Sequence, residues 1–325
     1  MINQEPQEIF LIHHGNQDYL QIAARCTQSA GNHVILIGND AETGKLCTAY
    51  YDDALIDLPE YRDFEAQYVH LSSAPIEFEL LCFKRYFYLY AIAKQRGLDH
   101  FWMIDSDATV LQNLTAITND FLLPNHYCAG ISTPRQSACN QEGFWWACSP
   151  HTSFWTMAGL EDFLSFLKNL YKGETRQLLD QKYEWHLQKN MPGGICDMTA
   201  LFLWQKSKSN VYNFAKSHLD GLPFFDNNLN ETGNVIDHEF AMVQNVMLKK
   251  VTHQNKMHWV HKSEGEQAIP VAALHFQGRA KACMATFERA QQLTYWTYAP
   301  HAFLQYATKR KNSLVRKIKK VIPIF

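Results

Sequence analysis

The N-terminal third of the chain alternates short apolar runs with a helical pattern, and this alternation most limits the possible folds. Apolar runs occupy residues 8–12 and 33–38, and residues 19–26 between them carry apolar side chains at helical spacing. A stronger helical pattern over 76–95 leads into a third apolar run at 100–104, HFWMI. Strands that alternate with helices in this way form a mostly parallel sheet with helices on its faces. We therefore expect an α/β fold with a mostly parallel central sheet.

The rest of the chain adds weaker signals of the same kind. Further apolar runs typical of strands stand at 68–71, 126–131, 144–149 and 271–274. Helical patterns are found at 159–171, 175–188, 196–206 and 280–293. Because the sequence contains no linker rich in Ser, Gly or Pro, we expect one main domain over residues 1–300 and a short extension over 301–325.

The charged residues limit the possible partners. The chain has 30 Lys and Arg against 32 Asp and Glu, and this near-neutral balance gives no reason to expect a nucleic-acid partner. Seven of the basic residues lie together in residues 309–325, where no acidic residue occurs. The apolar residues of this tail that share one helical face are Leu314, Ile318, Val321 and Ile322. A basic amphipathic segment of this kind is typical of attachment to an anionic membrane surface, the alternative being a tail that is solvated or packed on the body.

Two aspartates follow the apolar run 100–104 directly. They are Asp105 and Asp107, separated by Ser106. The bare Asp-x-Asp triplet is common by chance, but the carboxyl end of a buried strand is where α/β sheets bind ligands. Two like charges this close favour a cation beside them, and hard carboxylate oxygens suit Mg²⁺ or Mn²⁺. The alternative is a pair of solvated loop carboxylates, one of which caps the following helix.

A second group of polar residues follows the apolar run at 271–274. Its members are His275, Gly278 and Lys281. An imidazole can share Mn²⁺ with carboxylates, Gly278 permits close approach of the backbone to a phosphate, and Lys281 adds a positive charge. The spacing therefore predicts a metal and a phosphate side by side, whereas a single histidine at a strand end is more often a satisfied core or surface residue.

Taken together, these elements resemble the GT-A fold glycosyltransferases. The resemblance covers residues 8–290. It rests on three elements: the first strand with its loop and helix, the strand that ends in Asp-x-Asp, and the His-x-x-Gly-x-x-Lys element. The last of these is most similar to glycosyltransferase family 8. It implies a GT-A-like catalytic domain and a Mn²⁺ or Mg²⁺ ion on the diphosphate of a UDP-sugar donor. The implied metal ligands are Asp105, Asp107 and His275.

The resemblance also implies contacts to the nucleotide and its phosphates. Carried over to this sequence, the implied positions are His13, His14, Gly15 and Asn16 after the first strand, Lys84 or Arg85 on the helix before Asp-x-Asp, Ser106, Gly278 and Lys281. The sequence departs from the family after Lys281, which is followed by Ala282-Cys283 instead of the common Pro-Trp, and it has no clean counterpart of the family's central Asn-x-Gly motif. These departures concern the subfamily, the sugar and the stereochemistry.

Three carboxylates are candidates for a catalytic role: Asp197, Asp237 and Glu239. Asp197 follows the flexible turn Gly193-Gly194 at the start of a helix, where a retaining enzyme could use it near the acceptor hydroxyl. An inverting enzyme would need a carboxylate base, for which any of the three could serve. The alternative for Asp197 is a carboxylate that only interacts favourably with the helix dipole. The alternative for Asp237 and Glu239 is an ordinary surface residue or a helix cap.

Aromatic residues crowd the segment 144–155, FWWACSPHTSFW, and Trp185 adds another. Sugars stack their apolar faces on such rings, so the segment could line an acceptor or donor pocket, and core packing is the alternative.

The sequence as a whole leads us to expect a retaining, metal-dependent glycosyltransferase of polysaccharide or lipopolysaccharide biosynthesis, with a glycan or glycolipid acceptor. Since the N-terminus has Glu5 and Glu8 but no basic flank of a signal peptide, we expect a cytoplasmic protein attached peripherally to the inner face of the membrane. One alternative is a nucleotidyltransferase acting on sugar phosphates, although the first loop, HHGNQD, lacks the Gly-rich basic pattern that such an enzyme needs. Another is a non-catalytic module that binds nucleotide sugars.

Overall fold

A computed structural model of the chain describes residues 5–133, 143–243, 246–265 and 267–294. Its largest element is a seven-stranded sheet in the order β3-β2-β1-β4-β7-β6-β8. The strands are β1 (Glu8–His13), β2 (His33–Gly38), β3 (Ala49–Asp52), β4 (His100–Ile104), β6 (Ala129–Ser132), β7 (Ser149–Thr156) and β8 (Val211–Asn213). Only β7 runs against the others, because it pairs antiparallel with both β4 and β6. The expected α/β fold with a mostly parallel central sheet is therefore confirmed.

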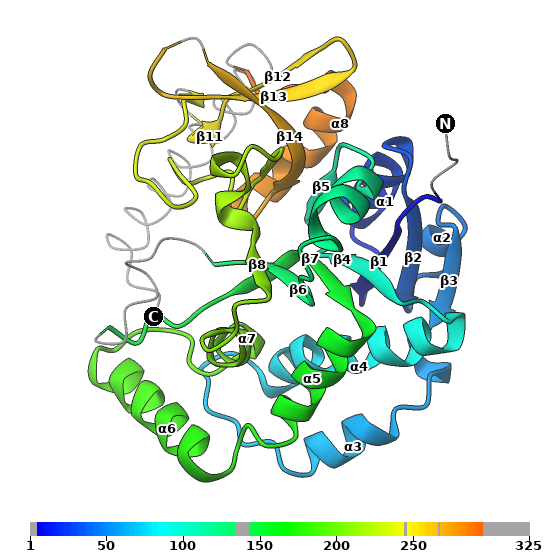
Figure 1. Cartoon of the computed structure of the whole chain (residues 1–325). Helices are drawn as coiled ribbons and strands as arrows, with labels where there is room; N and C mark the ends of the chain where they lie inside the picture. Colours follow the sequence, from blue (N-terminus) through cyan, green and yellow to red (C-terminus); the bar gives the residue numbers. More distant parts are fainter. Residues whose placement is uncertain (1–4, 134–142, 244–245, 266, 295–325) are drawn as a thin grey trace, which may run out of the picture.

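Helices α3 (Pro59–Glu65), α4 (Ile76–Arg96), α5 (Met157–Leu167), α6 (Gly173–Gln188) and α7 (Asp197–Gln205) lie on one side of this sheet. On the other side lie a second sheet and helices α1 (Asp18–Ser29) and α8 (Met284–Ala290) (Figure 1). The short helix α2 (Ala41–Gly44) leads into β3. Shorter turns of 3-10 or π helix occupy Asp53–Leu55, Ile117–Leu122, Phe214–Leu219 and Gly278–Cys283.

Alternation along β1 shows how the sheet separates two hydrophobic cores. Ile9 and Leu11 pack with α1 and the second sheet, whereas Phe10 packs with α3, α4, α5 and α7. Successive side chains of a strand point to opposite faces, so a strand buried on both faces is apolar throughout. The continuous apolar runs of β1, β2 and β4 thus have a structural explanation.

The long helix α4 carries its own start and stop signals. Its first turn contains Glu77 and Glu79 and its last turn Lys94 and Arg96, charges that complement the helix dipole at each end. Gly97 ends the helix in a left-handed conformation with φ of 66°, which glycine adopts without a steric penalty. The helix therefore delivers the chain directly into β4, whose end carries the Asp-x-Asp triplet.

The second sheet joins distant parts of the chain. Its strands are β5 (Ala108–Val110), β9 (Phe224–Phe225), β12 (Val251–Gln254), β13 (Met257–His261) and β14 (Ala268–His275), while β10 (Met242–Val243) and β11 (Leu248–Lys249) form a separate pair. Strand β14 pairs antiparallel with β5, and His275 lies opposite Ala108. This register brings the end of the last described strand beside Asp107.

Several sequence predictions require correction. The aromatic run 144–149 is not a strand, since β7 begins only at Ser149, and residues 68–71 form no strand, although the adjacent Ser72 makes an isolated bridge with Gly194. Strands β3 and β5 and helix α3 were not predicted. The predicted helix over 280–293 is a 3-10 turn followed by the short α8.

The predicted tail over 309–325 and the domain boundary at residue 300 lie outside the described residues. Among the helices that are described, none has both the length and the apolar character needed to cross a bilayer.

Candidate metal and donor site

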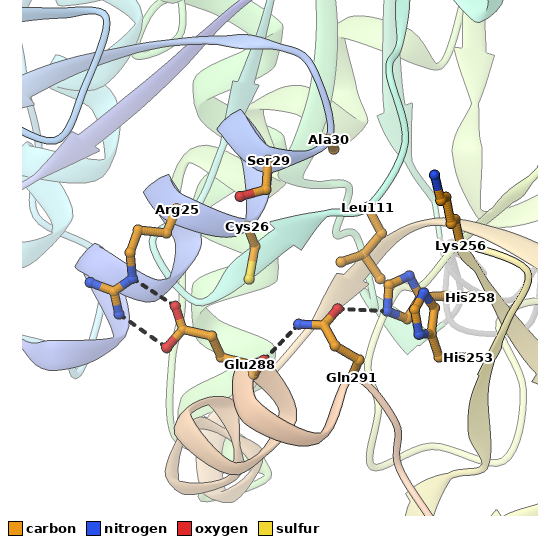
Figure 2. A pocket seen from close by; sticks show the side chains of 10 residues that line it. All are labelled: Arg25, Cys26, Ser29, Ala30, Leu111, His253, Lys256, His258, Glu288 and Gln291. Carbon is orange, nitrogen blue, oxygen red and sulfur yellow. Dashed lines mark hydrogen bonds and ion pairs between the residues drawn. The ribbon is translucent and has the colours of Figure 1, made fainter.

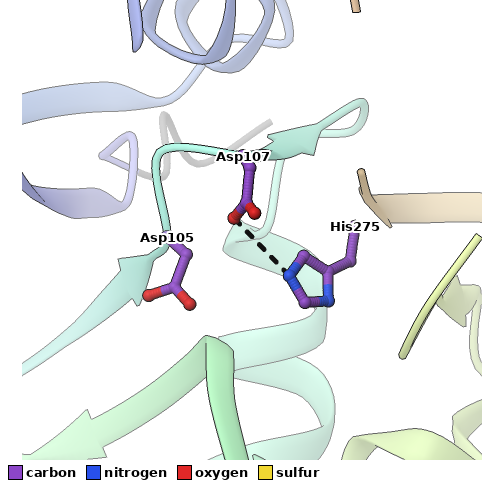
Figure 3. A group of neighbouring side chains, drawn as sticks. All are labelled: Asp105, Asp107 and His275. Carbon is purple, nitrogen blue, oxygen red and sulfur yellow. Dashed lines mark ion pairs between the residues drawn. The ribbon is translucent and has the colours of Figure 1, made fainter. Parts of the chain in front are cut away.

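Three side chains from separate segments converge at one end of the central sheet. Asp105 follows β4, Asp107 precedes β5, and His275 ends β14 (Figure 3). One donor atom from each lies within 4.8 Å of the other two, and His275 Nε2 is 3.5 Å from Asp107 Oδ1. Two carboxylate oxygens and an imidazole nitrogen form a donor set that suits Mn²⁺, and the carboxylates also suit Mg²⁺. The structure thus brings together the three residues predicted as metal ligands, which we call the triad.

The ring of His275 is oriented for this role by a backbone contact. Its Nδ1 donates to the carbonyl oxygen of Asn227 at 2.7 Å, and a carbonyl oxygen can only accept. Nε2 of the neutral ring therefore carries the lone pair and faces Asp107. Burial alone would lower the pKa of His275, but the hydrogen bonds to Asp107 and Asn227 and the charges of Asp107 and Asp105 together outweigh it and raise that pKa. The raised pKa means that Nε2 tends to carry a proton beside Asp107. A metal ion that displaced this proton would bind a nitrogen whose position is already fixed.

Two basic side chains border the carboxylates of the triad. Lys281 Nζ lies 3.0 Å from Asp107 Oδ2, and Arg85 Nη1 lies 2.8 Å from Asp105 Oδ1. Burial opposes ionisation of Asp107, but His275 and Lys281 outweigh it and hold the pKa of this carboxyl well below its usual range. Burial raises the pKa of Asp105, and Arg85 offsets part of that rise. The site is therefore a balanced cluster of charges.

The two basic residues predicted on α4 lie in different surroundings. Arg85 contacts the triad, whereas the ammonium of Lys84 lies over the rings of Tyr61 and Tyr88, 5.3 and 5.0 Å from their centroids. Arg85 also pairs with Asp197, whose Oδ2 accepts a second hydrogen bond from the Tyr86 hydroxyl at 2.9 Å. Arg85 thus links the predicted metal ligand Asp105 to the predicted catalytic carboxylate.

Asp197 is the first residue of α7 and is buried. The preceding turn packs tightly, because Ile195 N donates to Leu71 O at 2.8 Å and a Cβ atom on Gly194, where φ is 152°, would lie 2.2 Å from the same oxygen. This close approach requires glycine and fixes the start of α7.

The other two catalytic candidates lie in different surroundings. Glu239 is buried and paired with His218, close to the rings of Phe224 and Phe240, and Asp237 is exposed. Neither belongs to the triad, whereas Asp197 is joined to it through Arg85.

The predicted nucleotide loop lies beside Asp-x-Asp. His13 Nδ1 is 2.9 Å from the Ser106 hydroxyl, and Lys281 Nζ lies 5.2 Å from the centroid of the Tyr19 ring, next to His13. His14 pairs with Asp53 at 2.7 Å. The first loop of the chain and the segment that follows β14 therefore border the same site.

Two glycines and an asparagine complete the predicted set. Gly15 N donates to Asn39 Oδ1 at 2.7 Å, and Asn16 is exposed. Gly278 has a φ of 59°, and a Cβ atom there would meet no heavy atom within 4 Å. A bound group can therefore approach the backbone of Gly278 closely.

Beneath His275 lies a buried polar network that sequence reasoning missed. Lys249 and Asp226 form an ion pair in which both side chains are fully buried, 2.5 Å between Nζ and Oδ1. Asp226 Oδ2 accepts from the backbone N–H of His275 at 3.2 Å. Its carbonyl oxygen accepts from His151 Nε2 at 2.8 Å, and the His151 ring stacks on His275 with 4.2 Å between centroids. Asp226 directly follows β9, just as Asp105 follows β4. Strand β9 has only two residues, Phe224 and Phe225, and so short an apolar run does not predict a strand.

A separate polar cavity of about 310 Å³ lies between α1, α8 and the hairpin of β12 and β13 (Figure 2). It reaches Leu111, beyond the end of β5 that is distant from His275. None of the predicted site residues lines it.

Neither a protein-family model nor a curated protein matches this sequence. Mouse xyloside xylosyltransferase 1 in its apo form is 13% identical, with 65% of this chain and 86% of that chain covered and a TM-score of 0.45. The galactosyltransferase LgtC, in complex with donor and acceptor sugar analogues, is 15% identical, with 65% and 74% covered and a TM-score of 0.39. A glycosyltransferase involved in glycosylation of the major capsid of PBCV-1 is 10% identical, with 69% and 85% covered and a TM-score of 0.34. Likenesses at this level do not decide the function, which has to be inferred from the geometry of the site.

Proposed function

We propose that the protein is a metal-dependent glycosyltransferase of the GT-A type, similar to family 8, that moves a sugar from a UDP-sugar to a glycan or lipid-linked acceptor. The observation that carries the proposal is the triad. Asp105, Asp107 and His275 come from three segments far apart in the sequence, yet their donor atoms lie within 4.8 Å of one another. Lys281 and the open backbone at Gly278 border the same point.

The charges of the site suit the departure of a diphosphate. The main task in sugar transfer from a nucleotide is to stabilise the negative charge of the leaving diphosphate. A divalent cation held by the triad would supply the positive charge for this. Lys281, half-exposed and 3.0 Å from Asp107, can donate to a phosphate without leaving its carboxylate partner. Ser106 and His13 on one side and the backbone of Gly278 on the other would orient the same phosphates.

The surroundings of Asp197 favour a retaining mechanism. Its Oδ2 already accepts hydrogen bonds from Arg85 and Tyr86. A carboxylate engaged in this way stabilises neighbouring positive charge and is poorly placed to take a proton from an acceptor, as an inverting base would have to do. We therefore assign Asp197 a part in positioning Arg85 and the acceptor hydroxyl.

The test is to measure release of UDP or GDP from a panel of nucleotide sugars, with Mn²⁺, with Mg²⁺ and with a chelator. We expect activity that needs the metal, and Asp107→Asn and His275→Ala should each reduce kcat/KM by at least about 100-fold, because each removes a ligand. Matched controls are Asp237→Asn, an exposed carboxylate, and His253→Ala, which lines the separate cavity. Unchanged activity in the triad variants would refute the assignment.

Two further assays separate the alternatives: incubation with UTP and a sugar phosphate, and calorimetric titration with UDP. A nucleotidyltransferase would form the nucleotide sugar from a sugar phosphate and UTP, with release of pyrophosphate. A binding module would show Mn²⁺-dependent UDP binding in a calorimeter but no turnover with any donor of the panel.

A location at the inner face of the membrane is part of the proposal. It is supported by the sequence of residues 309–325, with seven basic residues and one apolar helical face. Each basic residue near an anionic surface contributes up to about 1 kcal/mol of binding free energy. A lipid-linked acceptor of polysaccharide or lipopolysaccharide biosynthesis would be found at the same surface.

A further inference from the structure

Two adjacent tryptophans before β7 lie in opposite environments. Trp146 is 4% exposed and stacks on Phe202 of α7, with 5.9 Å between ring centroids and planes 10° apart. Trp145 is 48% exposed. An indole with about half its surface open to solvent, next to one that is anchored in the core, is available for contact with a ligand.

The backbone before Trp145 holds an unfavourable conformation. Phe144 has a φ of 50°, in the left-handed region that residues with a side chain rarely adopt. Its carbonyl oxygen accepts a hydrogen bond at 2.7 Å from Nζ of Lys182, a buried lysine of α6. Such strained turns persist where the surrounding structure enforces them, and they are frequent at ligand sites. The turn therefore presents Trp145 at the surface while Trp146 stays inside.

A third ring supports the exposed indole from the side. Trp185 of α6 meets Trp145 edge to face, with 5.4 Å between centroids and planes 77° apart, and lies 6.2 Å from the Phe144 ring. We call Phe144, Trp145 and Trp185 the aromatic platform. Because its rings fix one another, the face of Trp145 is held in place before anything binds.

The platform lies beside the part of the site that holds Asp197. Trp146 O accepts from the Thr199 hydroxyl at 3.3 Å, and Cys148 N donates to Met198 O at 3.0 Å. The segment that carries Trp145 therefore runs along the first turn of α7. Asp197 begins that turn and is joined to Asp105 through Arg85.

We propose that the aromatic platform is the acceptor subsite, where the face of Trp145 stacks on the apolar face of a pyranose ring. The inference rests on the proposed function, since a glycosyltransferase must hold an acceptor hydroxyl near the donor and Asp197. Lys182 is buried and directs its ammonium to the Phe144 carbonyl, not to the ring of Trp145. What the platform offers among the described residues is thus an aromatic face, which suits the apolar face of an uncharged sugar ring of a glycan.

The experiment uses the full chain with Trp145→Ala. The probes are methyl β-D-glucopyranoside and methyl β-D-galactopyranoside, and binding is followed by saturation-transfer NMR and by transfer kinetics with the same two compounds as acceptors. We expect the variant to lose saturation transfer and to raise the acceptor KM about tenfold, the loss of roughly one stacking contact. Hydrolysis of the donor without acceptor and UDP binding should stay within about twofold, because the described ring contact of Trp145 is with Trp185 of α6, whereas the triad is built from other elements.

Two variants make the result specific. Trp145→Phe keeps a stacking face and should recover most of the acceptor affinity. Leu187→Ala removes an exposed apolar side chain from the same helix as Trp185 and should leave the acceptor KM unchanged.

The outcomes separate this inference from the proposed function. Absence of Mn²⁺ and UDP binding in the wild-type protein would contradict the proposed function. With those intact, an unchanged acceptor KM in Trp145→Ala, or no saturation transfer from the wild-type protein to either glycoside, would overturn the platform alone. An equal loss of UDP binding and acceptor binding in both Trp145 variants would show that the rings only support the fold, and would also overturn it.

Discussion

At the scale of single residues, His275 is held by neighbours on three sides. Its Nδ1 is bound by Asn227 O, its backbone N–H by Asp226, and its ring face by His151. Groups that fix the ring of a ligand raise metal affinity without touching the metal. Lys249 neutralises Asp226 in turn, so the geometry of the triad depends on a charge pair that has no access to solvent.

From this network we predict that substitutions can change the free energy of unfolding and the affinity for Mn²⁺ independently. Lys249→Met leaves Asp226 buried and unpaired, and should lower the free energy of unfolding by about 3–5 kcal/mol. The double variant Asp226→Leu/Lys249→Met should recover most of that loss, because no buried charge remains. Its affinity for Mn²⁺ should still be about tenfold weaker or more, since His275 has lost a partner.

Urea unfolding and calorimetric Mn²⁺ titration measure the two quantities. Wild-type Mn²⁺ affinity in the double variant would show that the network contributes to the fold alone.

That the three residues of the triad come together was predictable, because Asp105 and Asp107 follow one apolar strand and His275 ends another. His151, Asp226, Asn227 and Lys249 were not, because they come together only through the packing of β7, β9, β11 and β14. Likewise, the sequence could not show which of Lys84 and Arg85 would contact the triad, because the two basic residues are adjacent on α4 and point to different neighbours.

At the scale of elements, the length of an apolar run decided how well it was predicted. Strands β1, β2 and β4 have five or six residues and were found. Strands β5 and β3, with three and four residues, are too short to show a period. The run 144–149 has strand-forming residues, but it is pinned to α7 by hydrogen bonds and so pairs with no strand over most of its length.

Helix α6 carries a prediction on the pH dependence of stability. Burial lowers the pKa of Lys182 to about 8. Between that value and the usual pKa near 10.4, the unfolded chain binds more protons than the folded protein, so this residue makes stability rise with pH. The cost of its burial is present below pH 8 and is relieved as the pH rises toward 10.

The measurement compares the wild-type protein with Lys182→Met at pH 7 and pH 10. The difference in unfolding free energy should shift in favour of the wild-type protein by about 2–3 kcal/mol over this range. Lys208→Met, which removes a lysine paired at the surface with Asp162, is the control. Parallel profiles for the wild-type protein and Lys182→Met would show that Lys182 stays protonated throughout.

At the scale of the whole molecule, charge is divided unequally along the chain. Seven of the 30 basic residues lie in 309–325, which leaves 23 against all 32 acidic residues in positions 1–308. An acidic body is repelled by an anionic bilayer, and a basic tail is attracted to it. The proposed attachment would therefore orient the body away from the lipid surface.

Attachment through the tail is tested by sedimentation with vesicles that contain phosphatidylglycerol. A chain that ends at Thr308 should lose binding, and the full chain should lose it progressively as salt is raised, because the attraction is electrostatic. Turnover with a soluble acceptor should be the same for both chains. Equal binding of both chains to the vesicles would contradict the proposal.

The pairing of β5 with β14 also has a consequence for biosynthesis. Asp105 and Asp107 leave the ribosome long before His275, which ends the last strand of the described part of the chain. A nascent chain can therefore form the part of the site around the first loop and Asp-x-Asp early and still lack the third residue of the triad. The triad is complete only when β14 docks beside β5. Under the proposed function, a chain interrupted before residue 275 is therefore expected to be inert toward nucleotide sugars in the cell.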